Sequence, residues 1–303
     1  PFRDLLYFRD LMKVQRNVSP HLIINYTVKP NIWGSFAARL GRIRACSLVT
    51  GGGYMFIEVE GVGRRLVQAL GKLLYRFAIA KNDVVVFQNR DDVADFIRLG
   101  IVRRQQARIV NGSGVNLTFF SPVPLPEDPV FLMIARLLRT KGVSEYAEAA
   151  ELVACKFPHA RFRLLGMLDP GQDGIDPKSL DRWQARGLEY LGKLEDVRPA
   201  IAAASIYVLP SYREGTPRSV LEAMAMGRPI ITTDAPGCRE TVRHEENGLL
   251  VPVRDTASLA RAMERLLSDP ALRNRMGAAS LAIANEKYDV KAVNKELIKL
   301  LSV

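Results

Sequence analysis

Two glutamates in the last third of the chain, Glu214 and Glu222, have seven residues between them. An apolar run over 206–209 predicts a buried strand before them, and Thr216 as N-cap with Pro217 as first helical residue predicts a helix start between them. A helix N-terminus suits a phosphate, because its N–H groups are unpaired and its dipole end is positive. Carboxylates suit hydroxyl groups, whose hydrogen bonds they accept. Glutamates near a helix start are also common as surface acids, so the pair alone decides nothing.

Two cations, Arg136 and Lys141, follow another expected strand. Arg136 could bind a diphosphate as a planar fork and Lys141 as a point charge. Two basic residues after a strand are more often a solvated loop. The hypothesis of a diphosphate site therefore depends on this segment and the one with the two glutamates contacting the same ligand.

Short apolar runs alternate with amphipathic stretches along the chain. This alternation predicts parallel, doubly wound α/β sheets, which bind ligands beyond the carboxyl ends of their strands. The expected strands are 21–26, 46–50, 84–88, 130–135, 161–165, 188–191, 206–209 and 229–232, and the expected helices include 3–14, 31–40, 66–79, 143–156 and 217–226.

The composition is that of a globular protein. With 303 residues, 48% hydrophobic and 25% charged, the chain is neither disordered nor collagen-like, and it has no apolar run of the ~18 residues that a membrane span needs. The three cysteines, Cys46, Cys155 and Cys238, lie far apart, which favours a reducing cytoplasm over a disulfide framework. His21, His159 and His244 show no metal-ligand spacing, so we expect neither a metal nor a cofactor.

The net charge of +11 is unevenly distributed. Residues 1–122 carry 18 basic and 8 acidic side chains, whereas residues 123–303 carry 25 and 24. A basic half indicates an anionic partner such as a phosphate-rich ligand, an anionic membrane or a nucleic acid, although solubility alone could explain it.

Four prolines within 121–129 predict a stiff linker between two Rossmann-like domains. We expect a first domain over 1–122, a second over 123–286, and a C-terminal helix over 287–303 that packs back on the first domain. Two such domains would enclose a cleft. The chain opens with a helix where a strand and a glycine-rich turn are usual, so the first domain is expected to be incomplete at its N-terminus.

The segments Ala135-Arg136-Leu137 with Lys141-Gly142, and Glu214-Gly215-Thr216-Pro217 through Glu222-Ala223, together resemble retaining GT-B glycosyltransferases of family 4 (group 1). The similarity continues through Gly227–Ile230 and Asn247–Val251 and covers essentially all of 123–303.

The resemblance implies roles for these positions. Arg136 and Lys141 would neutralise the diphosphate of a nucleotide-sugar donor, Glu222 would hold the ribose hydroxyls, and Glu214 would hold hydroxyls of the donor sugar. Arg136, Lys141 and Glu214 would thus be the catalytic residues. The donor would also meet Gly215 and Thr216 through backbone N–H groups, Pro217 beside them, and Gly192, Lys193 and Leu194, where the family seats the base.

The first domain is similar to the branch that builds lipid-linked oligosaccharides and surface polysaccharides. The resemblance implies an acceptor or cleft role for residues after two expected strands and in a loop that matches the family at the domain junction. After the strands these are Lys29, Gly51, Gly52, Gly53 and Tyr54, and in the loop they are Asn111 and Gly112. The three consecutive glycines are as consistent with a flexible turn as with close approach of a ligand.

The stretch 64–77 is amphipathic, with Leu66, Leu70, Leu73, Leu74 and Phe77 on one stripe. The stripe could rest on an anionic bilayer, but the favoured interpretation is a helix packed on its own sheet.

The sequence therefore predicts a metal-independent retaining transferase, peripheral on the inner face of the cytoplasmic membrane. It would move a hexose or N-acetylhexosamine from a UDP-sugar to a polyprenyl-diphosphate-linked or polysaccharide acceptor. Two alternatives remain open, a UDP-sugar 2-epimerase of GT-B architecture and a non-catalytic anion- or nucleic-acid-binding module; no nucleic-acid motif supports the latter.

Overall fold

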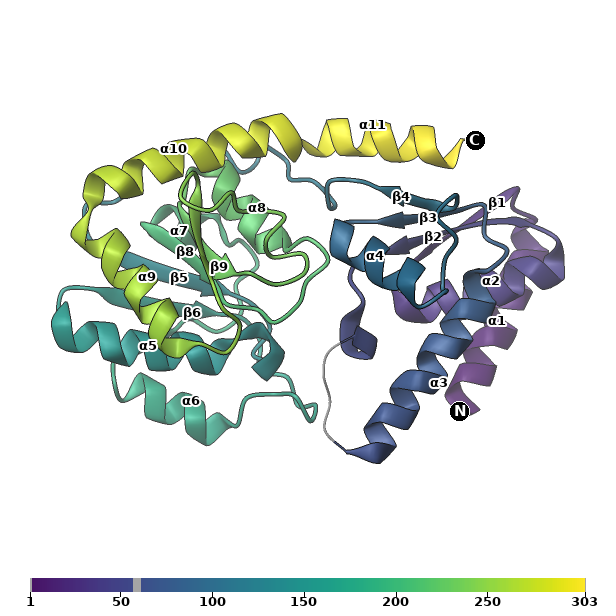
Figure 1. The fold of residues 1–303 in the computed structure, drawn as a ribbon, viewed down its shortest axis with the longest axis horizontal. Helices are drawn as coiled ribbons and strands as arrows, with labels where there is room; N and C mark the ends of the chain where they lie inside the picture. The colour runs from purple at the N-terminus through teal and green to yellow at the C-terminus, as the bar shows by residue number, and fades with distance from the viewer. Residues whose placement is uncertain (1, 57–60, 303) are drawn as a thin grey trace. The chain divides into compact units, whose positions relative to one another are not determined.

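The computed structural model describes residues 2–56 and 61–302 and divides the chain into two compact units (Figure 1). Unit 1 comprises Pro1–Gly112, Glu214–Thr216 and Val293–Val303, and unit 2 comprises Ser113–Arg213 and Pro217–Ala292. Unit 2 begins at Ser113, so the boundary predicted at 122/123 lies within unit 2.

Unit 1 contains a parallel sheet in the order β1-β2-β3-β4. Its strands are β1 (Leu22–Tyr26), β2 (Arg44–Val49), β3 (Val84–Phe87) and β4 (Ala107–Ile109), and its helices are α1 (Phe2–Val18), α2 (Val28–Gly41), the short 3-10 turn η1 (Gly53–Phe56), α3 (Val62–Ile79), α4 (Arg90–Arg98) and the greater part of α11 (Val290–Leu301).

Alternating side chains of β3 divide the core of unit 1 between two faces of the sheet. Val85 and Phe87 pack against Tyr75 of α3 and Phe96 of α4. Val84 and Val86 belong to a separate cluster that includes leucines of α11, among them Leu297. This period of two is the pattern of a strand covered on both faces, which explains why every residue of β3 is apolar.

Unit 2 contains a parallel sheet in the order β10-β9-β8-β5-β6-β7. Its strands are β5 (Val130–Ile134), β6 (Arg161–Leu165), β7 (Leu188–Tyr190), β8 (Ile206–Leu209), β9 (Ile230–Thr233) and β10 (Gly248–Val251), and its helical elements are η2 (Arg139–Lys141), α5 (Val143–Lys156), α6 (Pro177–Gln184), α7 (Arg198–Ala202), α8 (Arg218–Ala225), α9 (Thr256–Ser268) and α10 (Pro270–Lys287).

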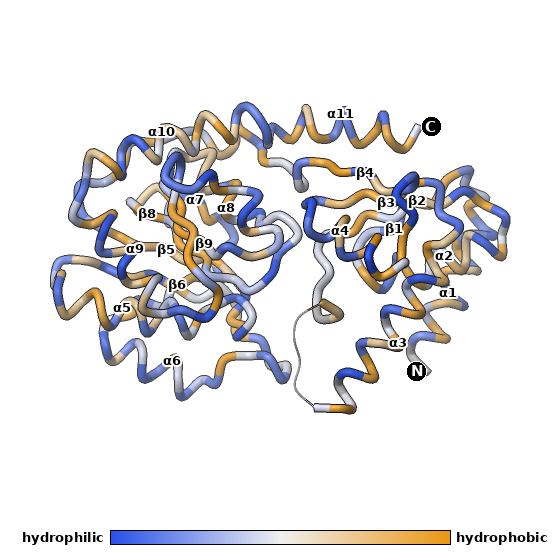
Figure 2. The backbone as a smooth tube through the Cα atoms, viewed as in Figure 1, coloured by the Kyte–Doolittle hydropathy of each residue, from blue (hydrophilic) through white to orange (hydrophobic). Residues whose placement is uncertain are grey.

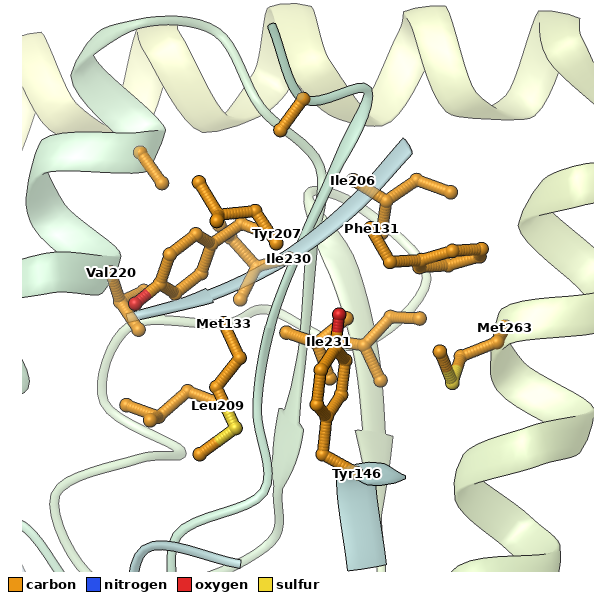
Figure 3. Close-up of a cluster of buried hydrophobic side chains, with 14 of the residues drawn as sticks. Phe131, Met133, Tyr146, Ile206, Tyr207, Leu209, Val220, Ile230, Ile231 and Met263 are labelled. Carbon is orange, nitrogen blue, oxygen red and sulfur yellow. The ribbon is translucent and has the colours of Figure 1, made fainter. Parts of the chain in front are cut away.

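Helices cover both faces of this sheet. Helix α5 lies beside α9 on one face, and α8 lies beside α10 on the other (Figure 1). The central strands are the hydrophobic part of the unit (Figure 2). Figure 3 shows Phe131 of β5, Ile206 and Leu209 of β8, and Ile230 of β9 within one buried cluster. Continuous apolar strands are expected where both faces are buried, so the strands at the centre were the easiest to predict.

All eight predicted strands are present, with ends displaced by at most two residues. The prediction missed β4, which has only three residues, and β10. It was also wrong about the start of α8. The N-cap is Pro217 and not Thr216, because the Thr216 hydroxyl donates to the Gln88 carbonyl oxygen at 2.9 Å instead of capping the helix.

Helix α3 packs on its own sheet through Tyr75, as the favoured interpretation expected, but the predicted stripe does not make this contact. Leu66, Leu70, Leu73 and Phe77 are exposed to between 48 and 69%, and among the predicted stripe residues only Leu74 is partly buried. The buried side of the helix is formed by Gln68, Tyr75, Ala78 and Ile79. The helix therefore carries two apolar stripes, and the one with the larger aliphatic side chains faces solvent in this structure.

Arg228 is fully buried in unit 2 and donates to backbone carbonyls around it. Its guanidinium lies 2.7 Å from the Ala204 oxygen, 2.6 Å from the Val123 oxygen and 3.1 Å from the Pro124 oxygen. Burial lowers the pKa of Arg228 to about 10, so the side chain stays charged at neutral pH. It ties the proline-rich segment to the end of α8.

We expect Arg228→Met to lower the free energy of unfolding by at least ~2 kcal/mol, because several buried carbonyls lose their donor at once. The measurement is denaturant unfolding at pH 7. Arg182→Met is the matched control, since Arg182 is exposed on α6, and it should change stability by less than about 0.5 kcal/mol. Equal stability of the two variants would contradict the role given to Arg228.

Candidate functional site

The loops that follow β5, β6 and β8 lie at one edge of the unit 2 sheet, because these parallel strands are neighbours. Their backbones approach closely. A Cβ atom at Gly142, after β5, would collide with the carbonyl oxygen of Pro210, after β8. A Cβ atom at Gly166, after β6, would collide with the carbonyl oxygen of Ala135. Gly142 also has φ 73°, which a residue with a side chain rarely adopts.

Arg136 lies on the loop after β5 with its side chain 68% exposed. Its Nη1 is 3.4 Å from a carboxylate oxygen of Asp169, in the loop after β6. An exposed pair at this distance is weak, so the guanidinium can turn to another anion at little cost.

Lys141 ends η2 and is half-buried. The residue before it, Thr140, accepts a hydrogen bond on its carbonyl oxygen from the Tyr212 N–H at 2.9 Å and donates its hydroxyl to Asp173 at 2.6 Å. The loop that carries Arg136 and Lys141 is therefore fixed by the loops after β6 and β8. A cation held by its backbone is preorganised for an anionic ligand.

Glu222 lies in α8 and is only 8% exposed. Burial raises the pKa of its carboxyl group, while the Arg218 guanidinium, 3.0 Å away, acts in the opposite direction. Ser219, one turn earlier, donates to the carbonyl oxygen of Ile134 at 3.2 Å. The start of α8 thus packs on the end of β5, two residues before Arg136, so Glu222 and Arg136 belong to one edge of unit 2.

The predicted base-binding segment follows β7 at the same edge. The Gly192 carbonyl oxygen accepts from the Gly166 N–H at 2.8 Å, and the Tyr190 hydroxyl donates to the Gly166 carbonyl oxygen at 2.8 Å. Nothing lies within 4 Å of the position a Cβ of Gly192 would take. Lys193 and Leu194 are exposed beside it. The segment therefore offers open backbone next to the loop after β6.

Glu214, Gly215 and Thr216 are grouped with unit 1 rather than with Arg136 and Lys141. The Asn89 side chain donates to the Gly215 carbonyl oxygen at 2.8 Å and to that of Glu214 at 3.4 Å. A Cβ atom at Gly215 would collide with the Thr50 carbonyl oxygen, so only glycine fits. The loop that carries Glu214 is thus held by the ends of β2 and β3.

The acceptor residues predicted for the first domain follow β1, β2 and β4 of one parallel sheet. Lys29, in the first turn of α2, pairs with Asp4 at 2.6 Å. Gly51 has φ 119° and lies against the backbone of Gly215, and Gly112 has φ 64° and lies against Thr216. The remaining predicted residues also follow these strands: Gly52, Gly53 and Tyr54 come after β2, and Asn111 comes after β4. Gly53 and Tyr54 are part of η1.

No group of three or more His, Cys, Asp or Glu side chains in the described part of the chain could hold a metal ion. The His244 imidazole accepts a hydrogen bond from the Leu250 N–H at 3.0 Å, which is a structural contact.

Sequence reasoning missed several residues that fix the site loops: Asn89, Glu145, Asp173 and Tyr212. Only Asn89 had a usable signal. It precedes Asp91 and Asp92 and caps α4 by accepting from the Asp92 N–H at 2.7 Å, a pattern typical of a helix start. The others act through partners far away in the chain.

Comparisons with known proteins show which family and which named relatives the chain resembles. A family model described as "Glycosyl transferases group 1" matches residues 128–269. The N,N'-diacetylbacillosaminyl-diphospho-undecaprenol alpha-1,3-N-acetylgalactosaminyltransferase of Campylobacter jejuni is 30% identical, over 99% of this chain and 81% of the relative. The UDP-Gal:alpha-D-GlcNAc-diphosphoundecaprenol alpha-1,3-galactosyltransferase of Escherichia coli is 26% identical, over 97% of this chain and 78% of the relative.

Among solved structures, the sucrose-phosphate synthase of Thermosynechococcus elongatus matches with a TM-score of 0.83 and 23% identity, over 97% of this chain and 76% of that one. At this identity the likeness establishes the fold alone.

The raised pKa of Glu222 predicts a pH-dependent cost to stability. A carboxyl group whose pKa is higher in the folded state contributes stability at low pH and loses it as pH rises through the folded-state pKa. We therefore expect Glu222→Gln to be more stable relative to wild type at pH 7 than at pH 4, as measured by denaturant unfolding at both pH values.

Glu189→Gln is the control with the opposite sign. Burial alone would raise the pKa of Glu189, but hydrogen bonds from Arg161 and Arg163 hold it below its ordinary value. That variant should lose stability relative to wild type as pH rises. A Glu222→Gln variant that follows the same trend as Glu189→Gln would refute the electrostatic description of Glu222.

Proposed function

Because this chain belongs to the group 1 glycosyl transferases, we propose that it moves a hexose or N-acetylhexosamine from a UDP-sugar to a saccharide carried on a polyprenyl diphosphate. The GT-B fold predicted from the sequence is confirmed, and the chain is a hexosyltransferase. The single observation that supports the substrates most strongly is 30% identity, over nearly the whole chain, to a relative named for an undecaprenyl-diphosphate acceptor. The name of the second relative adds a UDP-linked donor.

The proposed chemistry breaks the bond between the anomeric carbon and the diphosphate oxygen and forms a bond from that carbon to an acceptor hydroxyl. The negative charge that develops on the diphosphate would be stabilised by Arg136 and Lys141, whose loop is fixed by the loops after β6 and β8. The acceptor proton would pass to the departing diphosphate. Retention of the anomeric configuration is part of the proposal and is supported by the family resemblance of the Glu214–Glu222 segment.

The two glutamates would serve different parts of the donor. Glu222, nearly buried and at the edge shared with Arg136, would accept hydrogen bonds from the ribose hydroxyls. Glu214 would accept from hydroxyls of the transferred sugar, with Asn89 holding the backbone of its loop. Gly192, Lys193 and Leu194 would seat the base against open backbone.

We expect Arg136→Ala, Lys141→Ala and Glu214→Ala each to reduce the turnover number by about 10²–10³-fold, because each removes a preorganised partner of a reacting or departing group. The assay is UDP release from a UDP-sugar in the presence of a short polyprenyl-diphosphate saccharide. Lys178→Ala, which removes an exposed cation from α6, is the control and should retain wild-type turnover. A variant with wild-type turnover would exclude its residue from catalysis.

The exposed stripe of α3 supports peripheral contact with an anionic membrane, on the inner face of the cytoplasmic membrane. We call Leu66, Val67, Leu70, Leu73 and Phe77 the α3 apolar face; each is exposed to between 48 and 69%. Blue and orange alternate along α3 in Figure 2. Of the helices in the described part of the chain, none has the length and hydrophobicity that crossing a bilayer requires.

Charge favours a membrane over other apolar partners of this face. Arg65 and Arg76 are exposed on the same helix, and the first 122 residues carry most of the net charge. Basic residues near an anionic surface contribute about 1 kcal/mol each, and a hydrophobic face gains further by insertion at the interface.

We expect the double variant Leu66→Gln/Leu70→Gln to bind vesicles rich in phosphatidylglycerol at least about tenfold more weakly than wild type, because two inserted side chains lose roughly 1 kcal/mol each. Sedimentation with vesicles measures the binding. Leu152→Gln, an exposed leucine on α5, is the control and should bind as wild type does. Unchanged binding of the double variant would rule out the α3 apolar face as the contact.

A further inference from the structure

Three loops of unit 2 meet at one residue, Thr140. Its carbonyl oxygen accepts from the Tyr212 N–H at 2.9 Å and from the Ser211 hydroxyl at 3.2 Å, both in the loop after β8. Its hydroxyl donates to Asp173, in the loop after β6, and the Arg139 N–H donates to the Asp173 carbonyl oxygen at 2.8 Å. The backbone immediately before Lys141 is therefore fixed on two sides.

A second contact reaches the first turn of α5, beyond Lys141. The Tyr212 hydroxyl donates to a carboxylate oxygen of Glu145, in the first turn of α5. The Arg254 guanidinium lies 4.9 Å from the centroid of the Tyr212 ring. The other carboxylate oxygen of Glu145 is buried without a hydrogen-bond partner among the described residues.

These contacts place one residue, Tyr212, on both sides of Lys141. Its N–H holds Thr140 and its hydroxyl holds Glu145, so the segment 140–145 is clamped at both ends. A lysine side chain is long and flexible, and the volume that its ammonium group samples depends on where its backbone lies. Fixing the backbone restricts that volume, so less conformational entropy is lost when the ammonium group binds an anionic ligand.

We propose that Tyr212 and Glu145 are positioning residues that hold Lys141 where its ammonium group meets the donor diphosphate. The inference rests on the proposed function, because it assigns a ligand to Lys141. Neither residue touches the donor. They act through the hydrogen bond between them and through the Thr140 carbonyl.

The test is calorimetric binding of UDP to wild type and to Tyr212→Phe, which removes the hydroxyl and keeps the ring and the backbone N–H. We expect the affinity for UDP to fall about three- to tenfold, because the hydrogen bond to Glu145 is lost and Lys141 is positioned less well. The same substitution in a Lys141→Ala background should have less than a twofold effect, since the group that Tyr212 positions is absent. Glu145→Ala should match Tyr212→Phe, whereas Glu145→Gln, which keeps an acceptor oxygen, should restore most of the affinity.

Tyr288→Phe is the matched control. The Tyr288 hydroxyl is buried and donates to the Glu240 carbonyl oxygen at 2.6 Å, away from the site loops, so its loss should leave UDP affinity unchanged. Thermal melting of every variant shows whether it is folded.

The outcomes separate the inference from the proposed function. An equal loss of affinity from Tyr212→Phe with and without Lys141, or no loss at all, would overturn the positioning role while UDP binding stands. Failure of wild type to bind UDP would overturn the proposed donor and the positioning role with it.

Discussion

The candidate donor site depends on the contact between the loop after β5 and its two neighbours. Gly142 lies against the Pro210 carbonyl and Gly166 against the Ala135 carbonyl, at distances that no larger residue allows. The close approach lets Thr140 accept from the backbone of Tyr212 and donate to Asp173. The loop that carries the two cations is therefore fixed by its neighbours. Charges that are already in place stabilise a departing diphosphate best.

The sequence was sufficient for the fold wherever a strand is buried on both faces. Ile206–Leu209 is uniformly apolar, and its predicted bounds are those observed. Prediction from the sequence failed where contacts between distant residues determine the local structure. Three residues of β4 are too few for a pattern, and the N-cap of α8 moved to Pro217 because a distant carbonyl takes the Thr216 hydroxyl. In α3 the period was right, but two apolar stripes compete, and periodicity does not tell which one packs.

For the site, the sequence supplied the charged residues and not what holds them. Arg136 and Glu222 were recognisable because they stand beside the end of an apolar strand or the start of a helix. Glu145 and Tyr212 looked like an ordinary helix acid and a loop aromatic, and their hydrogen bond joins positions 67 residues apart. The basic first 122 residues, beside a nearly neutral remainder, are consistent with the proposed contact with an anionic membrane.

We propose above all that Arg136 and Lys141 bind the diphosphate of the donor. The most direct measurement is a crystal structure with UDP bound. We expect both phosphates within hydrogen-bond distance of Arg136 and Lys141, with the ribose on Glu222 and the base beside Gly192. A nucleotide bound with its phosphates on any other surface, and with these two cations facing solvent, would contradict it.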